Sequence, residues 1–407
     1  MRTYRDLFRT PEFTPLFLAS AAQVAAQTVS GLALGTLVHR ATGSALLSAL
    51  AMFGPALAQV VGATTLLSAA DRLPPRATIT GLAVLFALGT AAQAIPALPV
   101  WAVFAVLAGL GVLASLGGGV RYGLLHEIVA KDGYLLGRSL LNMSTGVMQI
   151  CGFALGGLLV TVLSPRGALL TGAALYGAAA AVARFGLARR PPRATGRVSV
   201  ATTWRDNARL WSSRPRRYVY LALWVPNGLV VGCEALFVAY APEDAGTLFA
   251  SAAAGMLAGD IMTGRFLPPR CRRRLAVPLL LLLAAPYGLL ALRPPLPVAV
   301  AAVALSSLGY SASLLLQERL MALTPDGLGG HALGLHTSGM IAMQGVGAVL
   351  AGTAAELTSP ATAMAVMATA SATVTLCLAR GLRPGGRGRP AALAPDGPPR
   401  TRWRARR

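Results

Sequence analysis

The sequence predicts an all-α integral membrane protein, with twelve transmembrane helices in two pseudo-symmetric six-helix bundles around a central cavity. Composition is the first reason, because 55% of the 407 residues are hydrophobic and 12% are charged, against about 25% charged residues in a soluble domain. A series of long apolar runs is the second reason, and an internal repeat is the third. The net charge of +22 comes from basic residues between apolar runs, which is typical of cytoplasmic loops and argues against a nucleic-acid partner.

A helix that crosses a bilayer needs roughly 20 mainly apolar residues, and runs of this kind form two sets of six. The first set lies near 15–38, 44–70, 77–95, 100–120, 139–163 and 168–187. The second set lies near 218–241, 245–264, 275–292, 297–316, 333–355 and 360–379. The first run also resembles a signal peptide, but its cleavage would leave an odd number of spans. We therefore expect it to be the first helix.

The distribution of basic residues predicts the orientation. With both termini in the cytoplasm, only Arg40, Arg166 and Arg293 of the 36 lysines and arginines fall in outer loops, as the positive-inside rule requires. We expect a monomeric, multi-pass protein of the plasma membrane, with anionic lipid at its basic inner loops. The predicted parts are an N-terminal bundle (1–187), a cytoplasmic linker (188–217), a C-terminal bundle (218–380) and a disordered basic tail (381–407).

The linker between the two sets carries a short amphipathic pattern. Trp204, Ala208 and Trp211 recur at helical spacing, with arginines off that stripe. This pattern fits a short helix on the inner membrane surface. A solvated basic segment without regular structure is the alternative.

The two halves of the sequence repeat each other. The segment "LPPR" follows the second span and recurs 194 residues later, after the eighth span. In the fifth span, four polar or small residues are matched 195 residues later: Asn142, Gln149, Gly152 and Gly157 correspond to Thr337, Gln344, Gly347 and Gly352. A repeat of six spans is typical of transporters built from two similar bundles.

The loop "LLSAADRLPPRA" (66–77) resembles the signature between helices 2 and 3 of the major facilitator superfamily. Asp71, Arg72 and Arg76 match that signature, while Leu67 stands where a glycine is usual. The resemblance implies that this loop forms a cytoplasmic gate, which breaks as the transporter opens inward. Basic charge that only sets topology is the alternative.

The fifth span resembles the glycine motif of the drug-efflux-like, twelve-helix subgroup of this superfamily. In "MQICGFALGG" (148–157), Gly152, Gly156 and Gly157 match the motif, while Phe153 replaces its proline. The helix-4 arginine of many proton-driven drug exporters would fall near Ala105 and is absent. We expect these glycines to allow close helix packing, from which any hinge motion would follow.

Polar side chains align along single faces of several spans. Ser20, Gln23, Gln27 and Ser30 share a face of the first span, and Asn142 and Gln149 share one of the fifth. The resemblance implies that helices 1, 5, 7 and 11 approach the cavity. The predicted substrate contacts are therefore Gln23, Gln27, Asn142, Gln149, Asn227 and Gln344. Alternatively, these amides hold helices together.

Two acidic residues lie within spans. Glu234 lies roughly 10 Å from the outer end of the seventh span, in the otherwise uncharged run "LVVGCEALFVAY" (229–240). Because an unpaired carboxylate is costly there, it is a candidate for proton coupling, for substrate contact or for a hydrogen-bonded structural role. Asp260, near the inner end of the eighth span, is expected to pair with Arg265 and to belong to the cytoplasmic gate.

These observations favour a secondary transporter, and proton-coupled export of a small amphipathic organic compound is the first hypothesis. Its partners would be that small molecule and protons. Proton-coupled uptake and a non-transporting membrane scaffold remain alternatives. An enzyme is not expected, because HExxH, GxSxG, zinc-spaced Cys/His and Walker-type sequences are all absent. No cofactor or metal site is expected either.

Overall fold

The computed structural model describes residues 4–66, 73–129, 133–192, 200–266, 269–325 and 328–382, and the regular structure of these residues is entirely helical. Within them, twelve helices are long and apolar enough to cross a membrane. The predicted all-α fold class with twelve spans is therefore confirmed.

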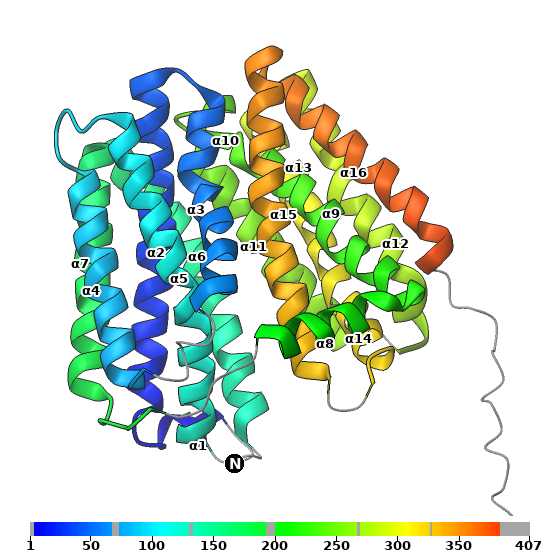
Figure 1. The fold of residues 1–407 in the computed structure, drawn as a ribbon. Coiled ribbons are helices and arrows are strands. Elements are labelled where there is room, and N and C mark those ends of the chain that lie inside the picture. The colour runs from blue at the N-terminus through cyan, green and yellow to red at the C-terminus, as the bar shows by residue number, and fades with distance from the viewer. Residues whose placement is uncertain are drawn as a thin grey trace, which may run out of the picture.

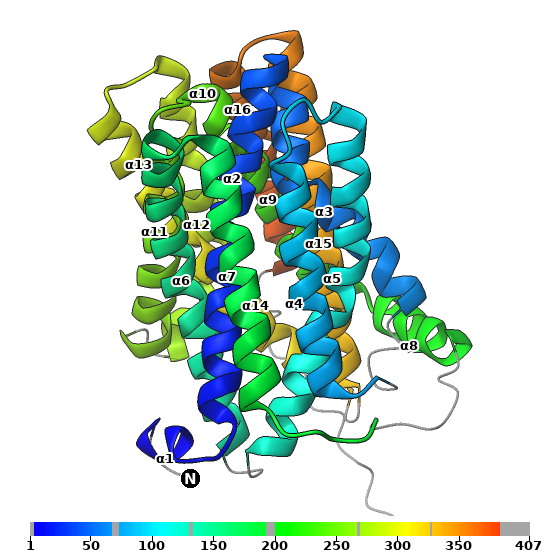
Figure 2. The ribbon, with the colours of Figure 1, turned by 90° about the vertical axis from the view of Figure 1, so that its left-hand side faces the viewer.

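The first bundle follows the short helix α1 (Tyr4–Phe8) and occupies the left of Figure 1. Its six helices are α2 (Phe13–Thr42), α3 (Ala45–Leu66), α4 (Pro75–Gln93), α5 (Val100–Ile128), α6 (Tyr134–Val162) and α7 (Ser164–Gly186). The end of the molecule that carries α1 and the linker helix is named the linker end, and the opposite end the distal end (Figures 1 and 2).

The linker contains a helix, α8 (Val200–Ser212), that packs on the second bundle. The Trp211 ring is stacked 6.0 Å from that of Tyr220 and 5.6 Å from that of Trp224. Arg216 donates hydrogen bonds of 3.0 and 2.8 Å to carbonyl oxygens in the last turns of α8, which otherwise lack partners. The predicted helix is thus present, and Trp211 stacks on the second bundle while 38% of its surface stays exposed. The side chain of Trp204 lies outside the described residues.

The second bundle contains spans that are interrupted. Its elements are α9 (Arg214–Ala235), α10 (Phe237–Tyr240), α11 (Ala245–Phe266), α12 (Pro269–Ala284), η3 (Ala285–Leu292), α13 (Leu296–Leu308), η4 (Gly309–Ser311), α14 (Ala312–Ala322), α15 (Gly329–Leu357) and α16 (Pro360–Leu382). The ninth span changes from α-helix to the 3₁₀-helix η3, and the tenth is broken by η4. Such segments inside a helix often mark a hinge or a strained site.

Helix ends differ from the predicted spans where polar residues occur. The fourth span was expected to end near residue 120, but α5 continues to Ile128 and includes Arg121 and Glu127. Backbone hydrogen bonds continue through such residues, whereas an apolar run stops at them. Similarly, α16 extends to Leu382, past the predicted start of the tail at 381. The remaining tail, 383–407, lies outside the described residues.

The two bundles contact each other in the distal half, where α3 packs against α15 and α6 against α11 (Figure 1). A Cβ added at Gly157 of α6 would lie 3.0 Å from Cα of Gly246 in α11. The rings of Phe153 and Phe249 stack nearby, with centroids 4.7 Å apart. Nearer the linker end, the hydrogen bonds, ring contacts and buried apolar clusters of the described residues lie within one bundle. The structure is therefore a conformation whose distal end is closed.

Helices α9 and α15 approach through glycine. A Cβ on Gly347 would collide with the carbonyl group of Gly228. Replacing Gly347 with alanine is expected to destabilise the protein by about 1–3 kcal/mol, the usual cost of overpacking, and so to lower its melting temperature in detergent. Gly334, on the same helix, has no atom within 4 Å of an added Cβ. Gly334→Ala should therefore melt at or slightly above the wild-type temperature; equal melting of both variants would contradict the close approach.

Candidate functional site

Glu234 lies near the end of α9, deep in the second bundle. Its exposed fraction is 6%, and its Oε1 atom has no hydrogen-bond partner among the described residues. Two tyrosines lie within electrostatic reach, Tyr287 of η3 and Tyr310 of η4. No ion pair joins Glu234 to a described basic residue. The predicted isolation of this carboxyl group from basic partners is therefore seen in the structure.

The helices that face Glu234 have irregular backbones at this level. Pro278 lies inside α12, and Pro286 is the second residue of η3. On the tenth span, Gly309 begins η4 and lies against the backbone of Leu283 in the ninth span. A Cβ added at Gly309 would not fit there. Irregular backbone is tolerated inside a membrane only where protein or a cavity surrounds it. The 3₁₀ segments η3 and η4 carry Tyr287 and Tyr310, which lie within electrostatic reach of Glu234 in the buried interior of the second bundle.

The polar face of α9 continues from Glu234 toward the linker end. Asn227 lies seven residues earlier, on the same face, and is also buried. The Gln344 side chain of α15 donates a hydrogen bond of 3.4 Å to Asn227 Oδ1. A small void lined by Asn227 and Tyr310 lies beside this pair. Two predicted substrate contacts are thus brought together, and Tyr310 connects their surroundings to those of Glu234.

The amides of the first bundle lie apart from this pair. On α6, Gly152 faces Thr28 of α2, and Gly146 faces Leu257 of α11. At about 100° per residue, Asn142 and Gln149 point between these two directions. Asn142 is exposed and Gln149 partly buried. Among the described residues, no hydrogen bond or ion pair joins either one to the second bundle, so their role as substrate contacts stays a prediction.

Two of the predicted amides are on α2. Gln27 is exposed and Gln23 partly buried. Ser30, which completes their predicted stripe, is turned instead toward Gly172 of α7. The predicted stripe is therefore divided: Gln27 is exposed, whereas Ser30 lies in the contact between α2 and α7.

The three glycines of the fifth span lie where other helices approach. An added Cβ would meet Thr28 at Gly152, Val29 at Gly156 and Gly246 at Gly157. The first two glycines thus pack α6 against α2 within the first bundle. Gly157 instead faces Gly246 of the second bundle, so it belongs to the contact surface between the bundles. This arrangement fits the predicted packing role.

The predicted cytoplasmic gate is described only in part. Asp71 and Arg72 lie outside the described residues, and Arg76 is partly buried in the first turn of α4. Asp260 and Arg265 are both exposed, and no ion pair joins them. They lie five residues apart on α11, which places them on different faces. The expected pairing is absent from this conformation, and the role of these residues as a gate stays a prediction.

A contact that the sequence does not indicate joins the bundles at the distal end. Glu356, at the end of α15, accepts a hydrogen bond of 2.6 Å from the Ser44 hydroxyl and one of 3.1 Å from the Leu46 backbone N–H. It therefore supplies the negative charge that the N-terminus of α3 favours. We name this contact the distal latch. Its members are 312 residues apart, so no local spacing indicates it.

Neutralising the distal latch is expected to loosen the distal end. Glu356→Gln removes a charge worth about 0.3–1 kcal/mol at an exposed helix N-terminus, which corresponds to roughly a two- to fivefold shift in the conformational equilibrium. Ala49, fully buried between the bundles, reports this shift. Maleimide labelling of Ala49→Cys should be correspondingly faster in the Glu356→Gln background. The exposed acid Glu243 is the control, and an equal effect of Glu243→Gln would contradict a specific latch.

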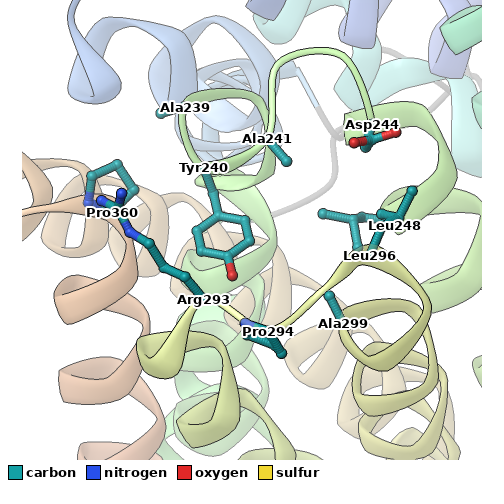
Figure 3. A pocket seen from close by; sticks show the side chains of 10 residues that line it. All are labelled: Ala239, Tyr240, Ala241, Asp244, Leu248, Arg293, Pro294, Leu296, Ala299 and Pro360. Carbon is teal, nitrogen blue, oxygen red and sulfur yellow. The ribbon is translucent and has the colours of Figure 1, made fainter.

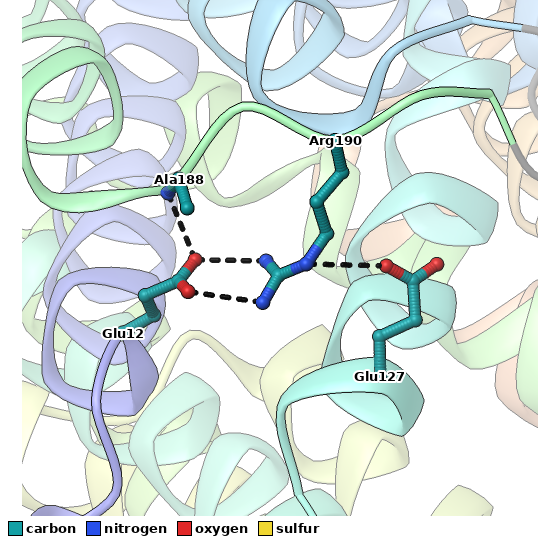
Figure 4. A network of polar contacts seen from close by, with 4 residues as sticks. All are labelled: Glu12, Glu127, Ala188 and Arg190. Atoms are coloured by element: carbon teal, nitrogen blue, oxygen red, sulfur yellow. Dashed lines mark hydrogen bonds and ion pairs between the residues drawn. The ribbon is translucent and has the colours of Figure 1, made fainter.

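A second missed network lies at the linker end (Figure 4). Arg190, just after α7, forms a bidentate pair with Glu12 at 2.8 and 2.9 Å, and its Nε lies 3.6 Å from Glu127 of α5. Glu12 also accepts the Ala188 backbone N–H at 2.9 Å. Glu12 and Glu127 belong to the first bundle, whereas Ala188 and Arg190 begin the linker, so this network fixes where the linker leaves that bundle.

A cavity lies elsewhere, at the distal end of the second bundle (Figure 3). Its volume is about 360 Å³, and Tyr240 and Arg293 line it, with Asp244 and Pro360 at other sides. The Tyr240 hydroxyl donates a hydrogen bond of 3.1 Å to the Leu290 carbonyl oxygen. None of the predicted site residues lines this cavity.

Comparison with known proteins identifies similar folds. The family model of the Major Facilitator Superfamily matches residues 16–243. The nucleoside transporter NupG is similar with a TM-score of 0.75 and 13% identity, over 91% of this chain and 99% of that one. A POT family transporter in complex with 5-aminolevulinic acid is similar with a TM-score of 0.72 and 10% identity, over 90% of this chain and 95% of that one. A bacterial homolog of the human lysosomal transporter Spinster, in an inward-facing and unoccupied conformation, has a TM-score of 0.68 and 14% identity, over 94% of this chain and 97% of that one. No curated protein matches the chain. At such identities the structural likeness concerns the fold alone.

Proposed function

This chain belongs to the Major Facilitator Superfamily and is a secondary transporter, and we propose that it exports a small amphipathic organic compound in exchange for protons. The proposal places it in the plasma membrane with both termini in the cytoplasm, so that the linker end faces the cytoplasm. This orientation is supported by the basic residues of the inner loops.

Glu234 is the observation that carries the proposal. A carboxyl group that is buried without a basic partner is stable in its neutral form and costly in its charged form. It can therefore take up a proton when it is exposed to one side of the membrane and lose it when exposed to the other. Proton binding and substrate binding would compete, which couples one to the other.

The bundle contacts supply the second part of the proposed mechanism. The closed distal end rests on small residues, of which Gly157 and Gly246 allow the closest approach. Separation at this surface, with closure at the linker end, would expose Glu234 and the Asn227–Gln344 pair to the outside. The gate assigned to Asp71, Arg72, Arg76, Asp260 and Arg265 would hold the linker end closed in that state.

Export is favoured over uptake by the glycine motif of the fifth span. The three motif glycines lie at helix contacts, and one of them faces the moving surface between the bundles. Proton-coupled uptake uses the same fold and is the second candidate.

Retention of fluorescent amphipathic dyes by expressing cells tests the direction of transport. If the chain is a proton-coupled exporter, cells that express it should retain less of at least one dye than control cells, and a protonophore should remove the difference. Higher retention in expressing cells would indicate uptake instead. A difference that survives the protonophore would exclude the proton gradient as the driving force.

A further inference from the structure

Two arginines share one aromatic ring at the linker end of the first bundle. The guanidinium carbon of Arg121 in α5 lies 5.1 Å from the ring centre of Tyr122, and that of Arg138 in α6 lies 5.3 Å from it. The Tyr122 hydroxyl donates a hydrogen bond of 3.1 Å to Asn142 Oδ1. Three polar groups and the ring are thus assembled from two neighbouring helices.

These arginines have no negative partner in the described part of the chain. Arg121 Nε is buried and makes no hydrogen bond, and neither arginine forms an ion pair with a described carboxylate. Two acids on this side of the bundle, Glu12 and Glu127, are engaged by Arg190. Two like charges beside one ring repel each other, so a bound anion would stabilise the cluster.

The cluster has access to the space between the bundles. Arg138 lies one helical turn before Asn142 on α6, in the arc between Gly152, which faces α2, and Gly146, which faces α11. Arg138 and Tyr122 are partly buried and Asn142 is exposed. In the present conformation the bundle contacts lie farther toward the distal end, so a ligand can reach these side chains from the linker end.

We propose that Arg121, Arg138 and Asn142 form a binding site for the carboxylate or phosphate group of an organic anion. Guanidinium groups beside an aromatic ring keep their N–H edges free for bidentate contact with such groups. The Asn142 amide nitrogen, whose oxygen is occupied by Tyr122, supplies a further donor. The anion is either the acidic end of a transported solute or a lipid headgroup at the membrane surface. Only the first alternative rests on the proposed transport function.

Ligand-dependent thermal unfolding in nanodiscs tests the site without transport. In discs of phosphatidylcholine alone, benzoate should raise the melting temperature of the wild type relative to chloride at equal ionic strength. Loss of either arginine should weaken benzoate binding by about tenfold or more, the equivalent of about 1.4 kcal/mol. The variants are Arg121→Gln and Arg138→Gln, with Arg138→Lys as a variant that keeps the charge and loses the planar fork.

Arg184 provides a matched control, because it lies 5.9 Å from the ring centre of Phe185 and no second described arginine lies over that ring. Arg184→Gln should bind benzoate like the wild type. If benzoate has no effect, melting is measured in discs that contain phosphatidylglycerol. If this lipid stabilises the wild type but not the Arg121 and Arg138 variants, the site binds a lipid headgroup. Equal responses of the wild type and these variants to both anions would overturn the proposal.

Discussion

Replacing Glu234 with glutamine is expected to abolish proton-driven accumulation of substrate while leaving substrate exchange intact. Glutamine has the shape of a protonated glutamic acid and cannot release a proton. The variant should therefore behave as a transporter held in its protonated form, which moves substrate in both directions but cannot use a gradient. The measurement compares uphill uptake with exchange between equal substrate pools, in proteoliposomes carrying an imposed pH gradient.

The exposed residue Glu243 provides the control, because Glu243→Gln removes the same charge nine residues away, in the loop between α10 and α11. This control should retain both activities. Loss of exchange together with accumulation in Glu234→Gln would indicate direct substrate contact or a structural role. Full accumulation in Glu234→Gln would contradict the assignment of Glu234 as the coupling residue.

Linking the bundles covalently at their closest point is expected to arrest transport. Cysteines at Gly157 and Gly246 would lie close enough to form a disulfide after a small shift, since a Cβ at Gly157 lies 3.0 Å from Gly246 Cα. The disulfide would hold the distal end closed and prevent substrate from leaving there. Oxidation should abolish transport by the double variant, and reduction should restore it.

The background for this experiment replaces the four native cysteines, Cys151, Cys233, Cys271 and Cys377, with alanine. Each single-cysteine variant should transport equally well with and without oxidant. If the oxidised double variant transports at the rate of the reduced one, the distal ends do not separate during the cycle. The alternating-access account would then be wrong for this chain.

Hydropathy predicted the twelve spans because each helix must supply an apolar surface long enough to cross the membrane. It did not predict where they end. The continuation of α5 through Arg121 to Ile128 depends on backbone hydrogen bonds, to which hydropathy is insensitive. The breaks at η3 and η4 had local signals in Pro286 and Gly309, which a count of apolar runs does not use.

The candidate site was predictable to the extent that single residues carry its signal. Glu234 is conspicuous as a lone acid in an apolar run, and Asn227 follows from its spacing on the same helix. Tyr287 and Tyr310, which complete the surroundings of Glu234, come from other spans and leave no mark in its local sequence. The distal latch is similar, because Glu356 and Ser44 meet only once the two bundles are packed together.

The most direct test follows protons in everted membrane vesicles that hold an acidic lumen. Small amphipathic compounds are added outside, and lumenal pH is recorded with the wild-type protein and with Glu234→Gln. We expect at least one compound to make the lumen more alkaline with the wild type only, because its entry would be exchanged for protons through Glu234. Accumulation of a compound without any change in lumenal pH, or equal alkalinisation with both proteins, would contradict proton exchange at Glu234.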